Sequence, residues 1–237
     1  RKGDFIGLKN YYLYLQEPAL FQSLFNSLFI AISSTLIVVV LAFLFAYAIT
    51  CTCMPFKFFF RLVALIPLLS PSILAAIALV YWFGNKGVLK ALLFGHSIYG
   101  PIGIIFASIY WTFPHALMIL STSLSLSDSR LYEAAEVLKT TKLRAFLTIT
   151  IPGARYGIIS TTFVVFTQVF TDFGVSKVIG GNYNVLATDI YKEVVGMQNF
   201  QMGAVISLVL LMPALVAFFI DQYSRKKQIS LLTSRSV

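Results

Sequence analysis

The polar side chains with the clearest potential for chemistry lie in two otherwise apolar stretches. Residues 156–171 carry no charge, contain hydroxyl and amide side chains, and are followed by Asp172. At 3.6 residues per helical turn, one face or its edge gathers Ser160, Thr167, Gln168 and Thr171. Polar groups are costly in apolar surroundings, so this face, with Asp172 at its end, predicts a hydrophilic pathway for a solute. Hydrogen bonds between packed helices are the alternative.

The second stretch contains Ser70, followed by Pro71 and Ser72. Proline removes a backbone donor and kinks a helix, and neighbouring polar side chains can satisfy the groups that are freed. Ser70 is therefore a further candidate for the same pathway, on a broken helix. A simple packing kink is the alternative.

Residue spacings typical of catalysis or metal binding are missing from the sequence. The two cysteines, Cys51 and Cys53, lack the gap of a zinc or redox pair, and Asp172, Asp189 and Glu193 show no ligand spacing. The Gly-rich phosphate loop of ATP-hydrolysing proteins does not occur either. We therefore predict no catalytic residue, no metal site, no cofactor and no ATP hydrolysis by this chain, which we expect not to be an enzyme.

Composition indicates which elements must position these residues. Of the 237 residues, 58% are hydrophobic and 11% are charged, whereas soluble domains carry about 25% charged residues. This balance excludes a disordered chain, a coiled coil and an ordinary soluble enzyme. The formal net charge of +9 would suggest nucleic acid in a soluble protein, but here the basic residues lie between apolar stretches, so we expect no nucleic-acid partner.

Those apolar stretches predict an all-α, polytopic helix bundle in a lipid bilayer. A transmembrane helix needs about 20 mostly apolar residues, and we expect five such spans near 26–48, 62–81, 102–124, 156–171 and 202–220. The fourth is the shortest. The segment 180–200 is too polar to span, and Val185–Val195 predicts a short interfacial helix that rests on lipid or receives a partner.

The orientation of the bundle follows from the Lys and Arg residues of its loops. Five spans place residues 50–61, residues 125–155 and the C-terminal tail on one side, with eleven of the 18 basic residues. The richer side is expected to be cytoplasmic. The N-terminus is then external, without a signal peptide, so we expect a further span upstream and treat residues 1–237 as part of a longer protein.

The loop between the third and fourth predicted spans carries the most specific pattern. Residues 131–138 favour a short helix, in which Ala134 and Ala135 leave a face with little bulk. An apolar return segment follows and ends at Pro152. This loop resembles the EAA signature of ABC-importer permeases, in which Glu-Ala-Ala is followed by Gly six residues after the Glu and by Ile-x-Leu-Pro. Glu133-Ala134-Ala135 and Ile149-Thr150-Ile151-Pro152 are in register.

Two positions depart from that signature, and the likeness extends beyond it. Ile151 replaces Leu, and Lys139 stands at the Gly position. Gly adopts positive φ readily and Lys does so reluctantly, so the sequence leaves the exact turn after the helix undetermined. The segments 172–174 and 199–204 also resemble permeases of the ferric-iron and 2-aminoethylphosphonate type, many of which fuse two halves. The chain would then be a single permease domain, one half of a longer or dimerising protein with six spans per half.

The resemblance implies a mechanism, partners and a location. A coupling helix would dock on a pair of cytoplasmic ATP-binding subunits. Its loop contributes Glu133, Ala134, Ala135, Leu138, Lys139, Ile149 and Pro152. A second permease half or copy and an extracytoplasmic substrate-binding protein would complete a bacterial inner-membrane importer for ferric iron or 2-aminoethylphosphonate. The alternative is a secondary transporter or channel not coupled to ATP, although the uncharged spans argue against ion coupling.

Overall fold

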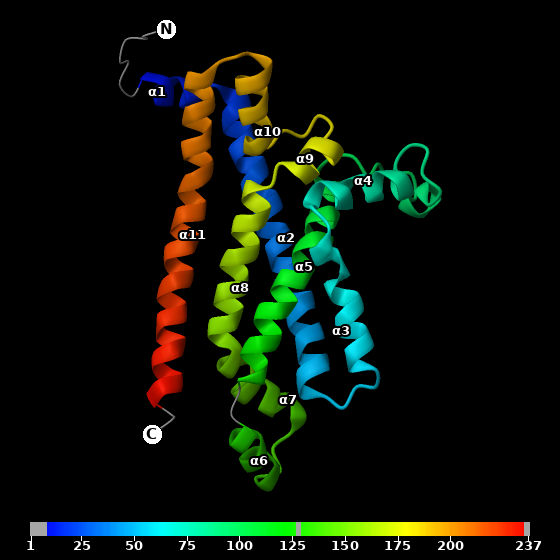
Figure 1. Ribbon diagram of the computed structural model, residues 1–237, viewed down its shortest axis with the longest axis vertical. Coiled ribbons are helices and arrows are strands. Elements are labelled where there is room, and N and C mark those ends of the chain that lie inside the picture. Colours follow the sequence, from blue (N-terminus) through cyan, green and yellow to red (C-terminus); the bar gives the residue numbers. More distant parts are fainter. Residues whose placement is uncertain (1–8, 127–128, 235–237) are drawn as a thin grey trace.

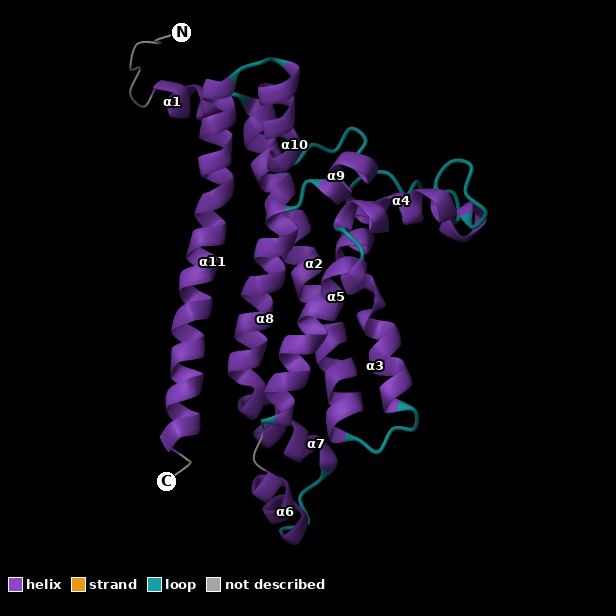
Figure 2. Cartoon of the chain, viewed as in Figure 1, coloured by secondary structure: helices purple, strands orange, loops and turns teal. Residues whose placement is uncertain are grey.

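The computed structural model describes residues 9–126 and 129–234, and this part of the chain is built from helices and short loops (Figure 1, Figure 2). The prediction of an all-α fold is confirmed for the described residues. In chain order the elements are α1 (Lys9–Gln16), α2 (Pro18–Cys51), α3 (Lys57–Leu65), a 3₁₀ turn (Ile66–Leu69), α4 (Ser72–Phe83), a second 3₁₀ turn (Lys90–Leu93), α5 (Pro101–Ser125), α6 (Ser129–Val137), α7 (Lys142–Ala145), a π-helical turn (Phe146–Thr150), α8 (Ile151–Thr171), α9 (Gly174–Ile179), α10 (Leu186–Tyr191), a second π-helical turn (Lys192–Gly196) and α11 (Phe200–Ser234).

Four helical segments of the described chain are long and apolar enough to cross a membrane, and a bent pair of helices adds a fifth if it counts as one span. The four are Pro18–Cys51, Pro101–Ser125, Lys142–Thr171 and Phe200–Tyr223. The first, third and fifth predicted spans are confirmed. The predicted fourth span, 156–171, is too short, because the helix already begins at Lys142 and continues through the π-helical turn.

The second predicted span, 62–81, is not one straight helix. It is divided into Lys57–Leu69 and Ser72–Phe83, whose axes are bent by 103°. Pro71 adopts an extended conformation, with φ −67° and ψ 155°, immediately before α4. Its missing N–H and the restriction that it places on Ser70 end the first helix there. Figure 1 shows α3 running along the bundle while α4 turns outward to the side, away from the long helices.

The core lies where α2, α5 and α8 pack together. Among the described residues, the contact between α2 and α5 is the most extensive of any helix pair. Small side chains allow the close approach. A Cβ atom added to Gly157 of α8 would lie 2.3 Å from Cβ and Oγ of Ser123 of α5. Ala31, Ala42 and Ala107 are fully buried in the same core. Small residues at helix contacts are typical of membrane bundles, where backbones must approach closely.

The outward faces of the long helices are apolar. On α2 the exposed residues recur every three to four positions, as in Phe21, Phe25, Phe29, Ile32 and Leu36. A stripe of this size on a helix of 34 residues would be unfavourable in water and is what a lipid-facing surface requires.

The connecting segments gather at the two ends of the bundle (Figure 1). The segments around α6 and α7, the start of α3 and the end of α11 lie at one end, and α1, α9 and α10 lie toward the other. The predicted sidedness of the loops therefore agrees with the structure. Residues 127–128 of the predicted loop 125–155 and residues 235–237 of the C-terminal tail lie outside the described residues.

The predicted interfacial helix at 185–195 forms, and its first half packs against the bundle. It comprises α10 and the π-helical turn that follows it, and Leu186 and Asp189 are buried. The hydroxyl of Ser27 in α2 accepts a hydrogen bond from the Leu186 N–H at 2.9 Å, and Asn26 Nδ2 donates to the Asn184 carbonyl at 2.9 Å. These bonds hold α10 against α2, so tertiary packing determines its position.

Candidate functional site

The helix with the EAA pattern, α6, projects beyond the end of the bundle and is attached to it at defined points (Figure 1). The Tyr132 hydroxyl is 2.9 Å from Thr150 Oγ1, which is fully buried in the π-helical turn before α8. Ala135 faces inward and is buried. Because Tyr132 connects α6 to the base of α8, a force on α6 would be transmitted to that long helix.

The neighbouring face of α6 is apolar and open. Leu131 is 48% exposed and Leu138 is 77% exposed, and Ala134 lies exposed between them on the same stripe. Glu133 is exposed at the edge of this stripe. An apolar stripe at the tip of a projecting helix, bordered by a carboxylate, is a typical contact surface for another protein.

The α6 helix ends in the geometry that the signature glycine would provide, although the residue there is Lys139. Its φ is 50°. The Lys139 N–H donates to the Glu136 carbonyl at 2.9 Å, and the Thr140 N–H donates to the Ala135 carbonyl at 2.8 Å. These two bonds form a Schellman motif, in which the residue after the helix is left-handed. The departure at Lys139 therefore changes the residue type but not the turn.

The return segment after α6 packs back onto α2. The Phe146 ring makes edge contacts with Phe43 and Tyr47 of α2, with ring centroids 6.0 Å and 5.1 Å apart. Ile149 is half-buried next to buried Thr150, and Pro152 is exposed in the first turn of α8. The predicted loop residues thus lie at one end of the molecule, with Glu133, Ala134 and Leu138 outward and Ala135 inward.

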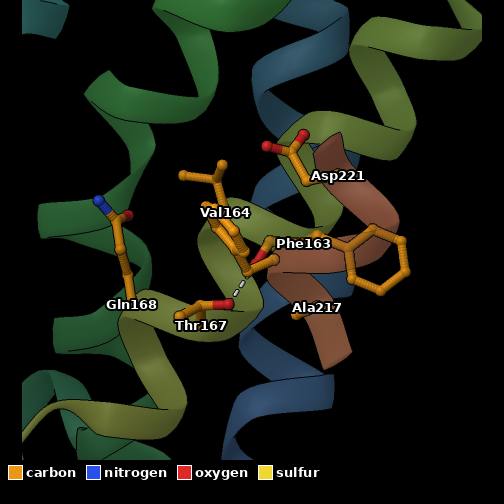
Figure 3. A pocket seen from close by; sticks show the side chains of 7 residues that line it. Phe163, Val164, Thr167, Gln168, Ala217 and Asp221 are labelled. Carbon is orange, nitrogen blue, oxygen red and sulfur yellow. Dashed lines mark hydrogen bonds between the residues drawn. The ribbon is translucent and has the colours of Figure 1, made fainter. Parts of the chain in front are cut away.

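The predicted pathway residues of α8 do not share one environment. Ser160 is buried between helices, and its hydroxyl has no hydrogen-bond partner among the described residues. Thr171 is exposed and donates to the Thr167 carbonyl at 2.8 Å. Thr167 and Gln168 line a pocket between α8 and α11 (Figure 3). The structure therefore places Thr167 and Gln168 together and Ser160 and Thr171 apart from them.

Asp172 and Ser70 lie away from that pocket, at the joint where α4, α8 and α9 meet. The Ser70 hydroxyl donates to the Pro67 carbonyl at 3.1 Å. The Asp172 carboxylate, directly after the α8 span, accepts from the Ser72 hydroxyl at 2.5 Å and from the Val175 N–H at 2.8 Å. Burial raises the pKa of the Asp172 carboxyl, while these hydrogen bonds oppose that shift.

Two residues at these places were missed by the sequence analysis. Ser72 was considered only as a flank of Pro71, yet its hydroxyl connects α4 to Asp172. Asp221 directly follows the predicted fifth span, 202–220, yet it is buried and lines the pocket with Thr167 and Gln168. An acidic residue inside an otherwise apolar helix was the available signal for Asp221.

Comparison with known proteins identifies the family. The model of the binding-protein-dependent transport system inner membrane component matches residues 54–229. The chain belongs to this family. It is accordingly an integral, multi-pass membrane component of a transport system, and the loop that resembles the EAA signature lies within the matched part.

Relatives of this chain are named for different substrates. It is 29% identical over 171 residues to the putative ferric transport system permease protein FbpB 1 of Haemophilus influenzae, covering 69% of this chain and 27% of that protein. It is 27% identical over 208 residues to the spermidine/putrescine transport system permease protein PotB of Escherichia coli, covering 84% of this chain and 76% of PotB. The chain thus spans about a quarter of the length of the ferric-transport relative.

Solved structures show the same fold at low sequence identity. A bacterial ABC transporter that imports the acidic polysaccharide alginate matches with a TM-score of 0.73 and 15% identity, covering 95% of this chain and 85% of that one. The MetNI methionine ABC transporter, in inward-facing conformations, matches with a TM-score of 0.73 and 13% identity, covering 89% and 98%. At such identities the likeness concerns the fold alone.

Proposed function

We propose that this permease is coupled to ATP hydrolysis through α6. The observation that carries the proposal is the geometry of α6, which exposes the stripe of Leu131, Ala134 and Leu138 and is tied through Tyr132 to the base of α8. A pair of ATP-binding subunits would receive this stripe on the cytoplasmic side, with Glu133, Ala135 and Lys139 completing the contact and Ile149 and Pro152 bracing it.

The rest of the assembly is proposed on the same basis. A second permease half or copy and an extracytoplasmic substrate-binding protein complete the importer in a bacterial inner membrane, with α6 and the C-terminus cytoplasmic. An alginate importer has been solved in complex with a substrate-bound periplasmic protein. Rocking of α8 with α6 would alternate access to a pathway between the halves.

The relatives favour a substrate that is a cation. Ferric iron is supported by the FbpB relatives, and a polyamine by the PotB relatives. The assignment to 2-aminoethylphosphonate is supported only by the sequence resemblance. Of the predicted pathway residues, we propose that Thr167 and Gln168 meet the substrate, with Ser160, Thr171, Ser70 and Asp172 positioned along or beside its path.

Changing Glu133 to Lys tests the coupling. In the assembled transporter we expect Glu133→Lys to reduce ATP-dependent uptake at least tenfold while membrane insertion is unchanged, because the new charge opposes docking at the stripe. ATP-dependent uptake and the amount of the variant protein in the membrane are measured on the same samples. Glu136→Lys is the matched control, since it makes the same charge change on α6, on the side of Glu133 away from the stripe.

Deleting residues 131–139 should also abolish co-purification with the ATP-binding subunit. Uptake that survives Glu133→Lys, or co-purification that survives the deletion, would show that the coupling assignment is wrong. A secondary transporter or channel would behave in that way.

A further inference from the structure

Two pockets adjoin each other toward the end of the bundle opposite α6, where α4 and α9 lie side by side (Figure 1). The larger, of about 470 Å³, lies between these two helices, and the smaller, of about 350 Å³, lies at the turn that follows α9. Tyr99 lines both pockets, so they form one continuous surface. We call the linings of the two pockets, drawn from residues 77–86, 99–100 and 178–183, the Tyr99 surface.

The turn after α9 leaves two backbone amides at the smaller pocket. The Gly180 N–H donates to the Ser176 carbonyl at 2.9 Å and ends α9, and the Tyr183 N–H donates back to the Gly180 carbonyl at 2.9 Å. Between these bonds, the amides of Gly181 and Asn182 donate to no backbone carbonyl among the described residues. Gly180 is right-handed, with φ −56°, and Gly181 is left-handed, with φ 58°. Successive amides in such a pair form a concave site that attracts anions.

The larger pocket adds a positive charge and an apolar wall. Lys86 is exposed in its lining and takes part in no ion pair within residues 9–126 and 129–234. Among the described residues, no acidic side chain lines either pocket. Ile77, Val80 and Val178 contribute aliphatic surface beside Lys86. A counter-ion for Lys86 would therefore come from another molecule.

The chemistry of the Tyr99 surface suits acidic side chains. Backbone amides and a lysine ammonium form charge-assisted hydrogen bonds with carboxylate oxygens, and the aliphatic wall suits the methylene groups and apolar neighbours of such residues. Lys86, Gly181 and Asn182 are all exposed, so a loop of another protein can reach them. Two pockets on either side of one tyrosine can receive neighbouring side chains of that loop.

The family of the chain indicates which protein this is. Members are components of binding-protein-dependent transport systems, and the Tyr99 surface lies toward the end of the bundle that is proposed to face away from the cytoplasm. We propose that the extracytoplasmic substrate-binding protein docks on the Tyr99 surface through a loop that carries acidic residues. One carboxylate accepts from the Gly181 and Asn182 amides, and another pairs with Lys86. This inference rests on the proposed function and adds the docking site of one of its partners.

The affinity of the substrate-binding protein for the assembled transporter in lipid nanodiscs, measured without ATP, tests the role of Lys86. Lys86→Glu should raise the Kd at least tenfold, and Lys86→Arg should leave it unchanged. Lys9→Glu is the matched control, since it makes the same charge change at an exposed lysine of α1, outside both pockets. Because salt screens exposed charge pairs, added NaCl should weaken binding to the unmodified transporter but not to Lys86→Glu.

A labelling experiment tests the smaller pocket. The exposed Cys51 and Cys53 are first replaced by Ser in the full transporter, and Asn182→Cys then places a thiol at the two amides. Saturating substrate-binding protein should slow the reaction of this thiol with a membrane-impermeant maleimide at least fivefold. It should not slow the reaction at Lys9→Cys. Citrate, a soluble polycarboxylate, should protect neither thiol.

The outcomes separate this docking site from the proposed assembly. If the substrate-binding protein binds the unmodified transporter but Lys86→Glu weakens binding no more than Lys9→Glu, or Asn182→Cys stays unprotected, the docking site is wrong and the assembly stands. Protection of Asn182→Cys by citrate and not by the binding protein would assign the pocket to a solute and overturn the proposal. A transporter that does not bind the protein at all would overturn both. Neither measurement uses ATP, so the results are independent of the effect of Glu133→Lys.

Discussion

Lys139 shows how a single residue is held in a conformation that its type does not favour. Its φ of 50° is stabilised by the paired hydrogen bonds that close α6 onto Glu136 and Ala135. For an L-residue with a side chain the left-handed region costs about 1–2 kcal/mol, a cost that glycine does not bear. The end of α6 therefore carries strain that a substitution can relieve.

Lys139→Gly should stabilise the end of α6 by about 1 kcal/mol, because glycine adopts the same φ without steric cost. The Thr140 amide, which donates to the Ala135 carbonyl, should then exchange its hydrogen about fivefold more slowly. Hydrogen exchange measured by mass spectrometry on peptides from this loop provides the check. Lys139→Ala should bring no such protection, and equal protection in both variants would contradict the role of φ.

Gly174 is the second residue whose type is dictated by its surroundings. A Cβ atom there would lie 2.8 Å from Ser72 Oγ and 3.1 Å from both Ile73 Cβ and Ile73 N. Gly174→Ala should therefore push α9 away from the start of α4 and destabilise the protein by about 1–3 kcal/mol, measured as a lower melting temperature in detergent. Gly196→Ala is the matched control, since nothing lies within 4 Å of its added Cβ, and a similar loss there would refute the steric argument.

At the scale of elements, uncharged length was sufficient to predict α2, α5 and α11, because a bilayer requires that length from any spanning helix. The helix-forming residues at 131–138 likewise predicted the short helix α6. The division of 62–81 could not be predicted from length, because whether Pro71 kinks or breaks a helix depends on its neighbours. Here Asp172, 100 positions away in sequence, accepts the Ser72 hydrogen bond.

The polar residues of the predicted pathway also show what periodicity alone can predict and what it cannot. Periodicity placed Ser160 near the same face of α8 as Thr167, but it could not predict which neighbouring helix covers each turn. Asp221 was missed for a related reason. A charge near the end of an apolar run indicates the membrane surface, and only the packing of α11 against α8 shows that this carboxylate is buried.

The bend between α3 and α4 makes a measurable prediction about these elements. Phe58 and Tyr81 are highly exposed, at 78% and 77%, and can carry spin labels. At about 1.5 Å per residue a straight helix would separate their backbones by about 35 Å. The 103° bend reduces this to about 20 Å, which pulsed electron paramagnetic resonance can distinguish. A distance near the longer value would show that 62–81 forms one straight span.

At the scale of the whole molecule, the net charge of +9 has a spatial meaning. Lys139, Lys142 and Arg144 lie around α6 and α7, at the end of the bundle where α3 begins and where the C-terminal part of α11 lies (Figure 1). An excess of basic residues on one side orients a polytopic protein with that side in the cytoplasm. The same end carries the exposed stripe of α6, so the proposed coupling requires this end of the bundle to face the cytoplasm.

The native cysteines provide a direct test of this orientation. Cys51 and Cys53 are exposed where α2 ends, and Val88, which is 83% exposed, lies beyond α4 toward the opposite end. In intact spheroplasts a membrane-impermeant maleimide should leave the native cysteines unlabelled and should label Val88→Cys in a Cys51→Ser, Cys53→Ser background. Permeabilised membranes should label both. If Cys51 and Cys53 react before permeabilisation and Val88→Cys does not, the bundle is inverted, and α6 would then face away from ATP and could not receive its force.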